Sequence, residues 1–313
     1  MHTIKKAIIV LLLIIGLVGC SSADPVIIEG KVNVLTSFYP LYDFTKKIGG
    51  EHVNVVNLVP AGVEPHDWSP KPRDMSNITK ADIFIYNGGG FEGWVDDFIG
   101  SLDKDSSVLV VEAIHDIDLI HTNEQNKGKE HEEKDHHDHG DVDPHAWTSP
   151  LQAMVMAKTI QEHLIEADPT HQADYEANYN VLEERLLALH HQLTDIVSRS
   201  PRKEIVVSHE AFGYIARDYA ITQVGVMGLS PEAEPTVKRM SEIKKFAEEH
   251  QIRYILFEEL VSPKLAQTLA QSLQIETLVL NPIEGLTEDQ VKANEDYFTM
   301  MATNLTTIEK ALQ

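Results

Sequence analysis

Three histidines lie where a strand-like segment gives way to a loop or a helix. His66 follows a predicted strand, in the segment Glu64-Pro65-His66-Asp67-Trp68, and His145 precedes a predicted helix. His209 ends a predicted strand, so all three lie where α/β sheets hold their ligands. The intervals of 79 residues (66 to 145) and 64 residues (145 to 209) are too long for a zinc finger. A site made from these side chains therefore has to be assembled by the tertiary fold.

A second group of histidines lies in a segment with almost no apolar residues. The run from 130 to 143 reads EHEEKDHHDHGDVD, so we expect a loop outside any core. Imidazole beside carboxylate suits Zn²⁺, Cu²⁺ or Ni²⁺ weakly and without fixed geometry. We interpret the segment as an accessory metal loop, because an unpacked loop cannot preorganise a coordination sphere; the alternative is a solvated acidic loop with incidental histidines. The loop spans residues 121–143, and its histidines are His121, His131, His136, His137 and His139.

Composition and missing motifs exclude several classes of protein. The chain has 26 Lys+Arg against 49 Asp+Glu, a formal net charge of −23, which argues against a nucleic-acid partner. Gly213 stands where an H-E-x-x-H motif beginning at His209 would need its second histidine. The chain also has no G-x-S-x-G elbow. These absences argue against a metallopeptidase of this type and against a serine hydrolase. We expect a binding protein and not an enzyme, with a zinc hydrolase that uses Glu64 or Glu210 as base as the alternative.

The N-terminus has the pattern of an export signal. Two lysines precede the apolar run Ala7–Gly16, which is too short to span a bilayer of about 30 Å. The sequence Leu17-Val18-Gly19-Cys20-Ser21-Ser22 resembles a bacterial lipobox, and Cys20 is the one cysteine of the chain. We predict a signal peptide over residues 1–19, a lipid on Cys20 and a tether over 20–30, which anchor the protein outside the cytoplasmic membrane. An ordinary signal peptide with an incidental cysteine is the alternative.

Strand and helix patterns alternate in two series, which predicts two parallel-sheet α/β lobes. The strands expected in the first series are Val32–Phe38, Val53–Val59, Asp82–Asn87 and Val108–Glu112. Those expected in the second series are Glu204–Ser208, Ile221–Val226, Arg253–Glu258 and Glu276–Leu280. The helices expected beside these strands are Ser149–Glu166, with a capping box between Ser149 and Gln152, then Pro235–His250, Ser262–Leu273, and a last helix from Thr287 to near the C-terminus.

A long stretch without glycine or proline lies between the two series. Over residues 171–198 leucines recur at three- and four-residue spacing, which predicts a helix with one apolar face. A single rigid helix there would limit how far the lobes swing; an ordinary helix inside one domain is the alternative. The predicted organisation is an N-terminal lobe over 31–170, a linker helix over 171–198 and a C-terminal lobe over 199–313, with a metal site in the cleft.

Several motifs together resemble one family, the zinc-type cluster A-I metal-binding lipoproteins of bacterial ABC uptake transporters. The matching pieces are the lipobox, Ser37-Phe38-Tyr39-Pro40, the His66 motif, Asn87-Gly88-Gly89 with Glu92 and Trp94, the histidine-rich loop, Asp143-Pro144-His145-Ala146-Trp147, and Ser208-His209-Glu210-Ala211-Phe212-Gly213-Tyr214. The resemblance implies two α/β lobes joined by a long helix, with one metal in the cleft. It also implies a receptor, expected to be a monomer, that passes zinc to a membrane permease driven by an ATPase subunit. A Gram-positive surface is favoured over a Gram-negative periplasm.

The resemblance implies His66, His145 and His209 as metal ligands, with Glu284 as the fourth. Many relatives have an aspartate before the proline of this last segment, whereas this chain has Asn281-Pro282. That departure leaves open a site closed by water or by Glu64. Three imidazoles and one carboxylate suit tetrahedral Zn²⁺, whereas manganese prefers more oxygen ligands. A manganese or other metal receptor, or an adhesin of the same family, is the alternative, although no partner surface is evident in the sequence.

Overall fold

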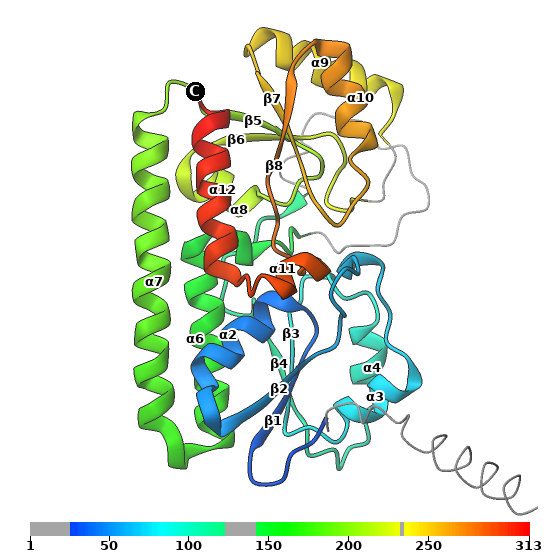
Figure 1. Ribbon diagram of the computed structural model, residues 1–313. Coiled ribbons are helices and arrows are strands. Elements are labelled where there is room, and N and C mark those ends of the chain that lie inside the picture. Colours follow the sequence, from blue (N-terminus) through cyan, green and yellow to red (C-terminus); the bar gives the residue numbers. More distant parts are fainter. Residues whose placement is uncertain (1–25, 123–141, 232–234) are drawn as a thin grey trace, which may run out of the picture.

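Two four-stranded parallel sheets form the centres of two α/β lobes (Figure 1). The structure is a computed structural model that describes residues 26–122, 142–231 and 235–313. The first sheet, in the order β2-β1-β3-β4, consists of β1 (Val32–Thr36), β2 (Val53–Asn57), β3 (Ile83–Tyr86) and β4 (Leu109–Glu112). The second sheet, in the order β6-β5-β7-β8, consists of β5 (Glu204–Val207), β6 (Thr222–Gly225), β7 (Tyr254–Phe257) and β8 (Glu276–Val279). Each observed strand falls inside the range predicted for it.

Both faces of each sheet are covered, which explains why the strands read as continuous apolar runs. In β1 the neighbours Val34 and Leu35 point to opposite faces, and both are fully buried, each in a different core cluster. The helices that surround the first sheet and lead out of it are α2 (Tyr39–Gly49), α3 (Pro72–Ile78), α4 (Val95–Ser101) and α6 (Pro150–Ala167), with the short turns η1 (Gly50–His52), η2 (Pro65–Asp67), η3 (Ala146–Thr148) and η4 (Pro169–His171). Those that follow are α7 (Gln172–Arg199), α8 (Gly213–Tyr219), α9 (Val237–Glu249), α10 (Lys264–Leu273), α11 (Glu288–Lys292) and α12 (Tyr297–Ala311).

Helix α7 confirms the predicted linker helix. It has 28 residues, and Figure 1 shows it running along one side of the molecule past both lobes. Its buried face includes Leu182, Leu186, Leu189 and Leu193, and one hydrophobic cluster joins these to residues of both sheets. The two lobes therefore share a core along α6, α7 and α12. Among the described helices, none is both long and apolar enough to cross a membrane.

Two local predictions were wrong. The last helix is not continuous from Thr287, because the chain breaks into α11 and α12. Asn294 adopts a left-handed φ of 55° after α11, and Asp296 then caps α12 through a capping box with Thr299. The capping box at Thr287 and Gln290 is present, but it starts only the short helix α11.

The capping box predicted at Ser149 and Gln152 does not form, although Ser149 is the N-cap residue and Pro150 follows it. Ser149 Oγ and Gln152 Nε2 instead donate to Asp218 Oδ2 in α8, at 2.6 Å and 2.8 Å. The side chains of Ser149 and Gln152 thus bind Asp218 of the C-terminal lobe and do not bind the free backbone N–H groups at the start of α6. The contact fastens the start of α6 to the C-terminal lobe.

Candidate metal centre

His66, His145, His209 and Glu284 converge between the lobes, each from a different loop. Glu284 Oε1 lies 3.5 Å from His66 Nε2, 3.6 Å from His145 Nε2 and 3.4 Å from His209 Nε2. The Nε2 atoms of His66 and His145 are 3.2 Å apart. All four ligand atoms lie within 4.8 Å of one another, and the side chains are at most 1% exposed.

The spacing of these atoms fits a four-coordinate zinc ion. Bonds of 2.0–2.1 Å in a tetrahedron separate the ligand atoms by about 3.3–3.4 Å. Four of the six separations run from 3.2 Å to 3.6 Å, and the two between His209 and the other histidines are at most 4.8 Å, so a small shift of the His209 side chain would complete the tetrahedron. Both oxygens of Glu284 are buried and accept no hydrogen bond from the described residues. A buried carboxylate left in this state is expected where a cation is to be bound.

His66 is held by the short turn that follows β2. Pro65 starts η2, and Glu64 Oε1 accepts a hydrogen bond from the backbone N–H of His66 at 3.2 Å. The imidazole packs edge-on against Phe91, with ring centroids 4.6 Å apart. Burial lowers the pKa of His66 to about 4, which keeps the ring neutral, as a metal ligand must be.

His145 is oriented by the aspartate two residues before it. Asp143 Oδ1 accepts from His145 Nδ1 at 2.8 Å and from the backbone N–H at 3.0 Å. With Nδ1 used in this way, Nε2 is the atom that faces the cluster. Asn87 Nδ2 donates to Pro144 O at 2.9 Å, which fixes the intervening peptide.

Asn87 is in turn held by the buried carboxylate of Glu92. Glu92 Oε1 accepts from Asn87 N at 2.7 Å and from Ser37 Oγ at 2.5 Å, and Oε2 accepts from Gly88 N at 3.2 Å. Burial raises the pKa of Glu92 to about 7 despite these bonds. The motifs at Ser37 and Asn87 therefore brace the His145 loop and do not contribute to the ligand set.

His209 leaves the end of β5 and meets the end of the neighbouring strand β7. Glu258 Oε1 accepts from His209 Nδ1 and from Ser208 Oγ, both at 2.5 Å. Burial alone would lower the pKa of His209, but Glu258 and Glu284 outweigh it and raise that pKa well above its ordinary value. A metal ion must then displace a proton from His209.

Glu284 lies in a strained turn after β8. Ile283 has a left-handed φ of 60°, which is a rare conformation for a β-branched residue. Asn281 Oδ1 accepts from Ile283 N at 2.7 Å, and Trp147 Nε1 donates to Pro282 O at 2.7 Å. Burial would raise the pKa of Glu284, but His66 and His209 outweigh it and hold the pKa well below the usual range. Asn281, the departure noted in the sequence, thus has a structural role in presenting Glu284.

Glu64 is not part of the four-residue cluster, although it adjoins it. Burial and the neighbouring charge of Glu284 raise the pKa of Glu64 to about 10, which favours the protonated form of its carboxyl group. Glu210, the other base considered for a hydrolase, pairs with Arg239 Nη2 at 3.0 Å.

Of the predicted loop histidines, the structure describes only His121. It is exposed and forms an isolated antiparallel bridge with Val142 at the base of the loop. The others lie outside the described residues, as does the predicted lipidation site; they are His131, His136, His137, His139 and Cys20.

Two parallel-sheet lobes that enclose a buried polar cluster define the class of two-lobed solute-binding proteins. The family model described as ZnuA, "Zinc-uptake complex component A periplasmic", matches residues 34–311, and the chain belongs to this family. It is 37% identical over 295 residues to the zinc-binding lipoprotein AdcA of Streptococcus pneumoniae serotype 4, covering 94% of this chain but 58% of that protein. The chain therefore spans less than two thirds of the length of the streptococcal relatives it matches.

Two further comparisons cover most of both chains. The high-affinity zinc uptake system protein ZnuA of Bacillus subtilis is 38% identical over 282 residues, covering 90% of this chain and 88% of the relative. The crystal structure of the Zn(II)-bound ZnuA-like domain of Streptococcus pneumoniae AdcA superposes with a TM-score of 0.76 at 36% identity, covering 90% of this chain and 99% of that one.

Proposed function

We propose that this chain is an extracytoplasmic zinc receptor that captures Zn²⁺ and delivers it to the permease of an ABC importer with an ATPase subunit. The observation that carries the proposal is the buried cluster of His66, His145, His209 and Glu284, whose ligand atoms have the spacing of a zinc tetrahedron. Relatives named as zinc-uptake and zinc-binding proteins support the same cargo. Zinc is the substrate carried, and no catalytic step is needed.

Glu284 distinguishes a receptor from a zinc hydrolase. A catalytic zinc keeps one position open for water, whereas a site that only binds the ion is closed by a fourth protein ligand. Glu284 Oε1 is within 3.6 Å of all three Nε2 atoms, which supports a site closed by a fourth protein ligand.

We also propose that a lipid on Cys20 anchors the protein outside the cytoplasmic membrane and that the protein is a monomer. The proposed domain boundaries are 31–170 for the N-terminal lobe, 171–198 for the linker helix and 199–313 for the C-terminal lobe.

The test is a metal titration of the metal-free protein under chelator competition. We expect one tight Zn²⁺ site with much weaker Mn²⁺ binding, and alanine at His66, His145 or His209 should abolish tight binding. His163→Ala is the matched control, because His163 lies on α6 and bonds the backbone of Thr159. If tight zinc binding survives in all three ligand variants, or disappears only when residues 123–141 are deleted, the proposal is wrong.

A further inference from the structure

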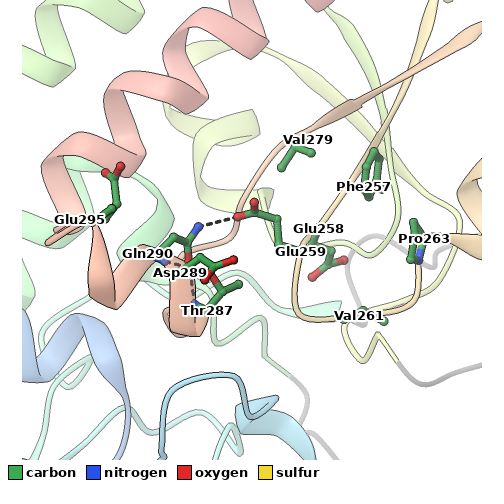
Figure 2. A pocket seen from close by; sticks show the side chains of 11 residues that line it. Phe257, Glu258, Glu259, Val261, Pro263, Val279, Thr287, Asp289, Gln290 and Glu295 are labelled. Carbon is green, nitrogen blue, oxygen red and sulfur yellow. Dashed lines mark hydrogen bonds between the residues drawn. The ribbon is translucent and has the colours of Figure 1, made fainter.

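The histidines of the two lobes are supported in different ways. His209 is oriented by Glu258 (Figure 2), which directly follows β7 in the same lobe. His145 is oriented by Asp143, and that aspartate is itself in contact with two residues of the other lobe. The two residues, which follow His209 in the same segment, are Gly213 and Tyr214.

Tyr214 holds the backbone of Asp143. Its hydroxyl donates to Asp143 O at 2.8 Å and accepts from Ile120 N at 3.4 Å, and the side chain is fully buried. Burial and the nearby charge of Asp143 raise the pKa of Tyr214 above its ordinary value, so the hydroxyl keeps the proton that it donates. Loss of this hydroxyl would take a donor away from a buried carbonyl next to the His145 loop.

Gly213 packs against the carboxylate of Asp143. A Cβ added at Gly213 would lie 2.2 Å from Asp143 Oδ2, whereas an ordinary van der Waals contact begins at 3.4 Å. Gly213 does not have a left-handed φ, so it is the space beside Asp143, and not the backbone conformation, that requires glycine here. Asp143 Oδ1 accepts two hydrogen bonds from His145, and the carboxylate therefore cannot move away from a larger residue without shifting that histidine.

We infer that Gly213 and Tyr214 are positioning residues of the zinc site, which hold Asp143 against His145 from the segment that also supplies His209. The inference rests on the receptor function proposed above. A supporting carboxylate fixes the orientation and the basicity of its histidine. The affinity for zinc therefore depends on how closely the segment after β5 packs against Asp143, and this one segment aligns ligands of both lobes.

Gly213→Ala tests the packing contact. Alanine favours a helix more than glycine does, so the backbone of α8 tolerates the change and the added methyl group acts on the Asp143 carboxylate. We expect the affinity for zinc to fall about 10–100-fold, the range for loss of a partner behind a metal-binding histidine. Gly100→Ala is the matched control, because Gly100 also lies in a short helix, α4, and an added Cβ there would meet open space.

Tyr214→Phe tests the hydrogen bond, because it removes the hydroxyl and keeps the ring. We expect the affinity for zinc to fall about two- to tenfold, which corresponds to the net contribution of one hydrogen bond. Tyr175→Phe is the matched control. Tyr175 is also fully buried, and its hydroxyl donates to Asp168 at the other end of α6.

The assay is Zn²⁺ titration of the full chain under chelator competition, with urea denaturation of the metal-free protein to measure stability separately. The decisive comparison repeats Gly213→Ala in an Asp143→Ala background. There the carboxylate that the methyl group displaces is absent, so Gly213→Ala should lower the affinity by no more than about twofold. A glycine that only supported the fold would give the same loss in both backgrounds.

Two outcomes overturn the inference. Gly213→Ala and Tyr214→Phe both bind zinc as tightly as their controls, or Gly213→Ala costs as much affinity in the Asp143→Ala background as in the unaltered chain. If Gly213→Ala fails to fold, Tyr214→Phe decides alone, and an affinity equal to that of Tyr175→Phe overturns the inference. The unaltered protein decides the receptor proposal: without a tight zinc site both fall, whereas a tight site that is insensitive to these substitutions overturns only the positioning role.

Discussion

Replacing Asp143 should weaken zinc binding through His145 while both sheets stay intact. Asp143 is 3% exposed, and its Oδ1 receives both the ring Nδ1–H of His145, at 2.8 Å, and the backbone N–H, at 3.0 Å. It does not touch the ion position directly, so any effect on affinity must pass through the orientation and basicity of the imidazole. Asp143→Asn and Asp143→Ala separate these two contributions.

The two variants should differ by about tenfold. Loss of a carboxylate behind a metal-binding histidine lowers affinity about 10–100-fold, or about 1.4–2.8 kcal/mol. Asparagine keeps an oxygen acceptor but removes the charge, and a charge-assisted hydrogen bond is about twice as strong as a neutral one. We therefore expect about a tenfold loss for Asp143→Asn and a loss approaching 100-fold for Asp143→Ala, which removes the acceptor as well.

The assay is Zn²⁺ titration against a chelator of known affinity, with circular dichroism to confirm the fold. Asp116→Asn is the matched control, because it makes the same change of charge at an exposed position on the segment that leads to the histidine-rich loop. The reasoning is refuted if both Asp143 variants bind zinc within threefold of the unaltered protein, or if the alanine variant binds more tightly than the asparagine variant.

Three further predictions concern the buried carboxylate of Glu92, the hydrophobic core that the two lobes share, and the histidine-rich loop. The pKa of Glu92 in the folded protein, about 7, lies above its ordinary value of 4.5, so unfolding releases protons at intermediate pH. The free energy of unfolding should therefore fall as pH rises from about 4.5 to 7, by about 3 kcal/mol in all. Urea denaturation at pH 5 and pH 8 should show a smaller difference for Glu92→Gln, and an unchanged difference would contradict the prediction. Leu186→Ala, at a fully buried position in the shared core, should cost about 2–5 kcal/mol and lower the thermal midpoint of both lobes together, whereas exposed Val181→Ala should not. Deleting residues 123–141 should leave tight zinc affinity unchanged; a loss would move the site to the loop.

Much of this arrangement could be predicted because its signals are local. Strands buried on both faces read as short apolar runs, and the leucine repeat of α7 reads as a helix with one buried face. The ligand histidines could be found because ligands in α/β folds gather at strand ends. Short helices such as α3 and α4 lack enough turns to show a periodic pattern, and they were missed.

What the sequence could not supply was the pairing of distant polar side chains. Glu258 directly follows β7, but its bond to His209 depends on β5 and β7 being neighbours in the sheet, which local pattern does not reveal. The same holds for Ser149, whose side chain bonds Asp218 from the other lobe and so leaves the predicted capping box unmade. Asn281 looked like a lost ligand, yet it holds the turn that presents Glu284.

The contacts between the lobes limit how the site can open. Trp147 sits beside the His145 loop; its Nε1 donates to Pro282 O at 2.7 Å, and its carbonyl accepts from Tyr297 Oη at 2.7 Å. Thr148 Oγ1 donates to Ala211 O at 3.2 Å, close to His209. Wide separation of the lobes would break these buried bonds and the shared core of α6, α7 and α12 at once. Release is therefore expected to begin with a change at one ligand and not with separation of the lobes.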